Sequence, residues 1–108
     1  MCEILIVRAI VPEHLKDQFE TWYDNEHLPE AHKAFGSYEA YRGWSSDNPE
    51  AHFAVYRFTN IGAVHEITEN HILGRLVAKF DERWQGYVTR TREVIVENQN
   101  LKGNLTND

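Results

Sequence analysis

The sequence predicts an α+β fold in which strands and helices follow one another as β-α-β-β-α-β. Runs rich in β-branched and aromatic residues, typical of strands, recur at 3–11, 37–46, 52–59 and 87–97. Segments with apolar residues at helical spacing separate the first run from the second and the third from the fourth. Turn-forming residues lie between the second and third runs, as in a hairpin.

The first strand is expected at residues 3–11, because EILIVRAIV is apolar with little alternation. Such a run is typical of a central strand covered on both faces. Pro12 ends it and suits the first turn of a helix.

The first helix is expected from Glu13 to about His27. Its apolar face carries Leu15, Phe19, Trp22 or Tyr23 and, at its end, Glu26 or His27. Pro29 disfavours helical backbone at the residue before it, so we expect the helix to break or kink there. A short helical piece at 30–35 then ends at Gly36.

The hairpin consists of strands 37–46 and 52–59, joined through turn chemistry at 47–50. Asn60 is expected to cap a weak helix, which becomes regular from Ile72 and ends near Gly86. The last strand is expected at 87–97 and a polar tail at 98–108.

This order is that of the ferredoxin-like fold, a four-stranded antiparallel sheet with its helices on one face. We therefore expect a single domain at residues 1–97. Because strand 3–11 is apolar on both sides, the other face of the sheet must also be buried. The simplest solution is a second copy packed sheet on sheet, which predicts a homodimer.

The net charge of −6 disfavours nucleic acid and anionic membranes as partners. No run approaches the length of a membrane span, and Glu3 and Arg8 flank or interrupt the first apolar run, unlike a signal peptide. The lone Cys2 excludes an internal disulfide. We expect a cytoplasmic protein.

The sequence predicts neither a metal site nor a bound cofactor. The six histidines lack ligand spacing, and no glycine-rich phosphate loop follows a strand. Thirteen aromatic residues exceed what so small a core needs, and a ligand pocket or a partner subunit would bury the surplus.

Residues 18–42, QFETWYDNEHLPEAHKAFGSYEAYR, resemble the signature of EthD-like families in the dimeric α/β-barrel superfamily. The matching elements are Trp22, Tyr23, Asp24, Glu26, His27, Pro29 and Gly36. The strand order agrees, so the resemblance extends over about residues 3–97. It departs in having Phe35-Gly36 where relatives often have Pro-Gly. The resemblance implies an activity among cyclases, lactone isomerases, cofactor-free oxygenases, haem-binding enzymes or members without a known reaction.

His27 is the candidate catalytic base. It shares a helical face with Phe19 and Tyr23, so its imidazole should face the sheet. Asp24, three residues earlier, is within reach to orient the ring and raise its basicity. In the alternative, His27 is structural and bonds a strand backbone.

Two tyrosines on the second strand, Tyr38 and Tyr41, are candidates to polarise a substrate oxygen. The candidate apolar wall consists of Trp22, Tyr23, Trp44 and Trp84. Adjacent strand positions face opposite sides of the sheet, and which set faces a cavity stays open. All of these aromatics could instead be core.

Arg57 is a candidate to hold an acidic substrate, if it points into the cavity. Arg90 and Arg92 share one strand face and are interpreted as a solvated edge or as intersubunit ion pairs.

The expected function is a small cofactor-independent enzyme that transfers protons on a hydrophobic or aromatic molecule, as an isomerase, cyclase or lyase. Two alternatives stay open. One is an oxygenase that is cofactor-free or haem-dependent, and the other is a non-catalytic ligand-binding or stress-response module.

Overall fold

The computed structural model describes residues 2–103, and its elements follow the predicted order. The strands are β1 (Glu3–Ile10), β2 (Glu39–Trp44), β3 (Ala51–Phe58) and β4 (Thr89–Val96). The helices are α1 (Lys16–Trp22), α2 (Leu28–Phe35), α3 (Ala63–Glu69) and α4 (Ile72–Trp84). The predicted tail is described as far as Gly103, and its remaining residues lie outside the described part.

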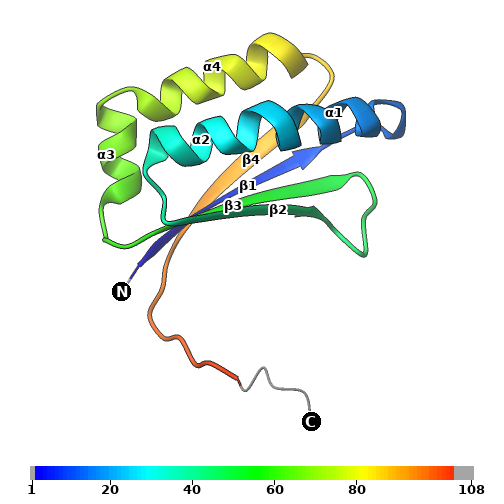
Figure 1. The fold of residues 1–108 in the computed structure, drawn as a ribbon. Helices are drawn as coiled ribbons and strands as arrows, with labels where there is room; N and C mark the ends of the chain where they lie inside the picture. The colour runs from blue at the N-terminus through cyan, green and yellow to red at the C-terminus, as the bar shows by residue number, and fades with distance from the viewer. Residues whose placement is uncertain (1, 104–108) are drawn as a thin grey trace.

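The strands form one antiparallel sheet in the order β2-β3-β1-β4. The helices all cover one face of this sheet, as Figure 1 shows. The predicted α+β, ferredoxin-like fold is therefore confirmed. Its central strand is β1, as the apolar run at its position predicts.

The register decides which side chains face the helices. Leu5 on β1 lies opposite Tyr56 on β3 and Val94 on β4. Four residues further along β1 and on the same face, Ala9 lies opposite His52 and Arg90. Because directly opposed residues in a sheet share a face, all of these side chains point towards the helices.

An aromatic cluster fills the core between the helices and the sheet. Phe19 on α1 is fully buried, and its ring centroid lies 5.1 Å from those of both Tyr23 and Trp84. These rings meet at tilted or edge-on angles, the arrangement that aromatic pairs favour. Much of the aromatic surplus is thus buried within one chain.

Of the two outcomes expected at Pro29, a break or a kink, the break does not occur. A π-helical turn at Tyr23–His27, here called the π turn, connects α1 to α2 without interruption. Pro29 lies in the first turn of α2. A proline ring collides with the carbonyl one turn earlier in a regular α-helix, and the wider π turn moves that carbonyl away. The end of α2 at Gly36, with φ of 70°, is as predicted.

Asn60 does not cap the following helix, which begins later than expected, at α3. The buried carboxylate of Glu3 on β1 caps it instead. Its two oxygens accept hydrogen bonds from the backbone N–H groups of Gly62 (3.2 Å) and Val64 (2.8 Å). A cap from a residue so distant in sequence leaves no local signal, which explains the error.

The second face of the sheet is uncovered in the single chain. Its half-buried apolar side chains belong to β1 and β3 and are Ile4, Ile6, Ile10, Phe53 and Val55. The tail leaves β4 and runs away from the body of the molecule (Figure 1).

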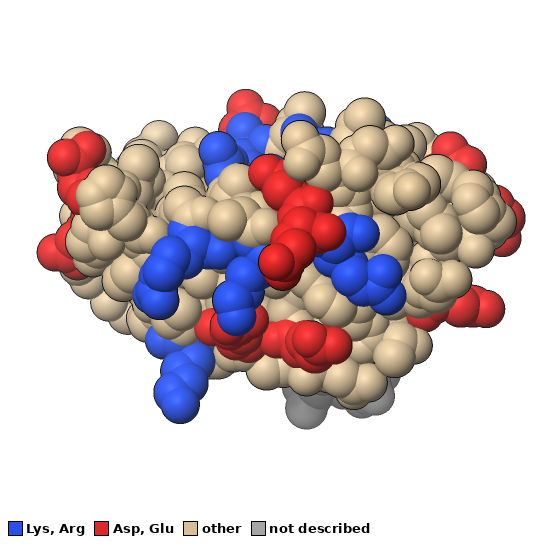
Figure 2. Space-filling view, turned by 90° about the horizontal axis from the view of Figure 1, so that it is seen from above, with Lys and Arg blue, Asp and Glu red and all other residues tan. Residues whose placement is uncertain are grey.

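The helical side carries charges of both signs. Seen from above the helices, acidic and basic side chains are interspersed and form no field of one sign (Figure 2). Within the described residues, no helix is long and apolar enough to cross a membrane.

Candidate functional site

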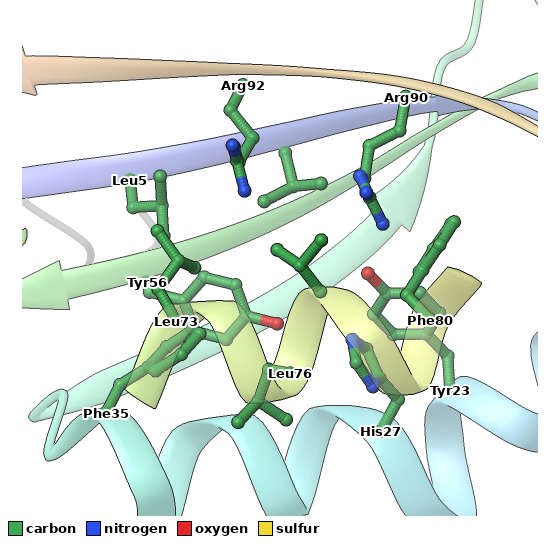
Figure 3. Close-up of a pocket in the computed structure, with 12 residues that line it drawn as sticks. Leu5, Tyr23, His27, Phe35, Tyr56, Leu73, Leu76, Phe80, Arg90 and Arg92 are labelled. Carbon is green, nitrogen blue, oxygen red and sulfur yellow. The ribbon is translucent and has the colours of Figure 1, made fainter. Parts of the chain in front are cut away.

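A cavity lies between the sheet and the helices, beside the π turn. It contains about 330 Å³ of space free of protein atoms, including its open mouth. Its apolar wall comes from Leu5 and Val7 on β1, Phe35 on α2, and Leu73, Leu76, Val77 and Phe80 on α4. Its polar groups are His27, Tyr23, Tyr56, Arg90 and Arg92 (Figure 3). An apolar hollow with a few converging polar groups is the usual form of a small-molecule site.

His27 ends the π turn and is 6% exposed. The indole of Trp22 stacks on its imidazole at 4.3 Å and 15°, and the ring of Tyr23 meets it edge-on at 5.0 Å. Nδ1 of His27 is buried and has no hydrogen-bond partner in the described part of the chain. Two aromatic rings, and no polar partner, therefore hold this imidazole in place.

The charge state of His27 follows from its surroundings. Burial lowers the pKa of His27 to about 4; Glu30 opposes the shift, and Arg90 and Lys79 add to it. The imidazole is therefore neutral near pH 7, in the form that can accept a proton.

Tyr23 and Tyr56 bring hydroxyl groups to the cavity from opposite sides. Tyr23 begins the π turn and Tyr56 lies on β3, and their hydroxyls point towards the space between them (Figure 3). Burial raises the pKa of Tyr23 and that of Tyr56 well above the ordinary value of 10.0. Both phenols are therefore protonated near neutral pH and can donate a hydrogen bond.

Arg90 and Arg92 project from β4, which is an edge strand, towards the cavity (Figure 3). Arg90 is half-buried and Arg92 is exposed, so the interpretation as a solvated edge holds for Arg92. They lie opposite Ala9 and Val7 of β1, on the side of the sheet that the helices cover. Arg90 pairs with Asp81 at 3.1 Å and lies over the ring of Phe80 at 4.3 Å. Among residues 2–103, no carboxylate lies within 4.0 Å of the Arg92 guanidinium.

Asp24 does not lie against His27, contrary to expectation. Its carboxylate accepts a hydrogen bond from Nη2 of Arg42 at 2.7 Å, and its side chain is 65% exposed. The pairing of residues three apart assumes a regular α-helix, and the wider π turn separates them.

Arg42 is the centre of a second polar cluster, outside the cavity. It also pairs with Glu20 at 3.2 Å, and the Glu20 carboxylate accepts a hydrogen bond from the Trp44 indole at 2.7 Å. The buried His52 lies beside it, with Nε2 3.3 Å from Nη1 of Arg42. Burial, aided by Arg42, lowers the pKa of His52 to about 4. Trp44 thus belongs to this cluster and does not line the cavity.

The two predicted tyrosines and Arg57 also lie outside the cavity. Tyr41 is exposed on the uncovered face of the sheet. Arg57 lies on that face too, where it pairs with Glu97 at 3.0 Å and Glu39 at 3.3 Å. The Tyr38 hydroxyl accepts a hydrogen bond from Nε of Arg57 at 2.9 Å. The polar groups that the sheet contributes to the cavity are instead Tyr56 on β3 and Arg90 and Arg92 on β4, whose side chains face the helices.

Among the residues predicted to form the apolar wall, Tyr23 lines the cavity. Trp22 stacks on the imidazole of His27 and does not itself line the cavity. Trp84 is core, 1% exposed, and does not line it. The sequence analysis missed Tyr56, Arg90 and Arg92 as site residues. The alternation of arginine and threonine on the last strand was visible, but the strand alone does not show which face the helices cover.

Aromatic rings flank the imidazole of His27: Trp22 lies at 4.3 Å and Phe80 at 5.9 Å between ring centroids. Within residues 2–103, no group of three or more potential ligand side chains is placed to hold a metal ion.

The chain has the ferredoxin-like fold that its EthD-like resemblance implies, and solved structures share this fold. No family model and no curated protein matches the sequence. An EthD family protein from Bacillus halodurans has a TM-score of 0.66 at 15% identity, covering 86% of this chain and 97% of its own.

Two further solved structures share the fold. HapK from Hahella chejuensis has a TM-score of 0.66 at 15% identity, with 96% of this chain and 100% of its own covered. SnoaB from Streptomyces nogalater, described as a cofactor-independent oxygenase and solved as an N63A mutant, has a TM-score of 0.62 at 12% identity, covering 94% of this chain and 98% of its own. These likenesses concern the fold.

Proposed function

We propose that this protein is a cofactor-independent enzyme that transfers protons on a hydrophobic or aromatic small molecule, as an isomerase, cyclase or lyase. The observation that carries the proposal is the neutral imidazole of His27 in a small apolar cavity, with Nδ1 unpartnered in the described structure. A buried polar group without a partner is costly in a fold, and such groups concentrate at functional sites.

In the proposed reaction, His27 removes a proton from a carbon atom next to a substrate carbonyl. Electron density then moves onto the carbonyl oxygen, which becomes an enolate. The hydroxyls of Tyr23 and Tyr56 are the groups that donate hydrogen bonds to that oxygen. The imidazolium returns the proton at another carbon in an isomerisation, or to a leaving or cyclising oxygen in the other reactions.

Trp22 is the proposed positioning residue for the base, in place of Asp24. Its stacked indole restricts rotation of the imidazole without supplying a charge. The base is therefore tuned by burial and by neighbouring cations, and not by a carboxylate partner.

The test uses deuterium exchange from D2O into a panel of conjugated cyclic ketones and lactones, followed by NMR. The native protein should catalyse exchange at the carbon next to the carbonyl for at least one of them. His27→Gln should abolish this exchange, while His14→Gln, a change at an exposed histidine, should not. Exchange by His27→Gln at the native rate contradicts the assignment.

A cofactor-independent oxygenase is the second candidate, supported by the fold shared with SnoaB. An enolate or carbanion formed by His27 can react with dioxygen instead of being reprotonated. Oxygen uptake in the presence of the same compounds, measured with an electrode, distinguishes an oxygenase from an enzyme that only transfers protons. A protein that binds such compounds but catalyses neither process is a binding module.

We further propose that two copies pack through the uncovered face of the sheet. The support is the set of half-buried apolar side chains that no element of the described chain covers. Light scattering should give twice the monomer mass. Ile6→Asp, at the centre of that face, should yield monomers, whereas Ala78→Asp on the exposed side of α4 should not. A monomeric native protein contradicts this proposal.

A further inference from the structure

We propose that the ligand of this cavity carries an acidic group, a carboxylate or an acidic phenol, and that the guanidinium of Arg92 binds it. The inference rests on the proposed function in one respect, that the cavity is a small-molecule site. It adds the chemical class of the ligand and the residue that selects it.

The first argument is the local charge of the cavity. The residues that line it include two arginines and no carboxylate, and its histidine is neutral. The whole chain carries a net charge of −6. A cationic lining within an acidic protein does not follow from composition, and the general field of the protein will not attract an anion. A local cation must therefore hold it.

The second argument separates the arginines of the chain by their partners. Arg90 is neutralised by Asp81, and Arg57 by Glu97 and Glu39. Arg92 lines the cavity and has no carboxylate within 4.0 Å among residues 2–103. A guanidinium binds a carboxylate through two parallel hydrogen bonds, which also fixes the orientation of the ligand. Of the two arginines that line the cavity, Arg92 is the one whose guanidinium is left without a carboxylate among residues 2–103.

The third argument is the effect on His27. The charged and titratable groups around its imidazole come from the π turn, α2, β3, α4 and β4, and are Tyr23, Glu30, Tyr56, Lys79, Asp81, Arg90 and Arg92. Lys79 is paired with Glu30 and Arg90 with Asp81, which leaves Arg92 as the cation without a carboxylate in this group, and an unpaired cation disfavours the imidazolium that proton transfer must form. A bound anion reverses this effect and raises the pKa of His27 towards the pH at which a base is most effective.

The lining of the cavity limits the ligand further. Its apolar wall of leucine, valine and phenylalanine favours a small ligand with an apolar body. The acidic group would lie at the β4 side, below Arg92, with the ring between Leu5, Leu76 and the tyrosine hydroxyls (Figure 3).

The test compares benzoate with benzamide, which has the same shape without the charge. Calorimetry on the native protein should show that benzoate binds at least tenfold more tightly. Arg92→Gln should weaken benzoate binding by roughly 10- to 100-fold, the range for a charge-assisted hydrogen bond, and leave benzamide unchanged. Arg92→Lys should bind benzoate with an affinity between those of the native protein and Arg92→Gln. Arg75→Gln, at an exposed arginine on α4, is the matched control and should change nothing.

A second readout follows the imidazole of His27 by NMR. Benzoate should raise its pKa in the native protein and much less in Arg92→Gln. Equal binding of benzoate and benzamide, undetectable binding of benzoate, or unchanged benzoate binding by Arg92→Gln would each overturn the proposal. None of these results would affect the conclusion from deuterium exchange that His27 is the base. Conversely, if His27→Gln kept the exchange activity, the conclusions from benzoate binding would still hold. The two proposals therefore fail separately.

Discussion

Acidification should destabilise the fold through two buried histidines, His27 and His52. The pKa of each is about 4 in the folded chain, against 6.5 for an exposed histidine. Between these values the unfolded chain binds a proton at each position that the folded chain does not. The free energy of unfolding therefore falls as the pH falls from above 6.5 towards 4. The loss is about 2 kcal/mol per histidine at pH 5 and about 3 kcal/mol at pH 4.

The assay is urea unfolding followed by circular dichroism at pH 7.5 and pH 5, at one protein concentration. The native protein should lose about 4 kcal/mol from the two histidines together. His27→Gln and His52→Gln should each lose about 2 kcal/mol less than the native protein over the same interval. Carboxylates titrate equally in all variants, so their contribution cancels in the comparison.

His14→Gln is the control, because His14 is exposed and should follow the native protein. A native-like loss in His27→Gln would refute the reasoning. It would mean that the pKa of His27 is the same in the folded and the unfolded chain, so that burial does not lower it.

Three further outcomes follow from the structure. Asp24→Asn should leave the pKa of His27 unchanged by NMR titration and cost at most about 1 kcal/mol in urea, because Asp24 is 65% exposed and Arg42 keeps its ion pair with Glu20. A clear shift in the pKa of His27 would indicate that Asp24 does interact with the imidazole. Glu3→Ala should lower the free energy of unfolding by about 1–3 kcal/mol, since it leaves two helix N–H groups uncapped. A loss below 0.5 kcal/mol would contradict this and show that water can replace the carboxylate as hydrogen-bond acceptor. Gly36→Ala should cost roughly 1–2 kcal/mol in thermal unfolding through its φ of 70° alone, because nothing lies within 4 Å of the added methyl; an unchanged midpoint would argue against the left-handed turn.

Much of the fold was predictable because the information is local. Helical spacing of Phe19, Tyr23 and His27 places an imidazole on the inner face of the first helical region, and the structure buries it there. The same reasoning failed for Asp24 because it assumed regular helical geometry. The π turn is a response to Pro29 within the packed helix, and no simple pattern in the sequence announces it.

The site on the sheet was not predictable for a different reason. In β1 both alternating sets are apolar, so the strand itself does not indicate which set faces the helices. The set that faces the helices contains Tyr56 on β3 and Arg90 and Arg92 on β4, whereas Tyr41 on β2 and Arg57 on β3 belong to the set that faces away. A one-residue difference in alternation thus changes every polar group contributed by the sheet.

The sequence by itself determined the order of strands and helices, the acidic character, the uncovered apolar face and the inward position of His27. These features depend on composition and on periodicity within single segments. Only the tertiary structure decided which polar groups surround His27. Strand register, the π turn and the long-range cap from Glu3 arise from contacts between residues far apart in the chain. The free energy of such contacts depends on residues from several segments at once, so the pattern within one segment does not predict them.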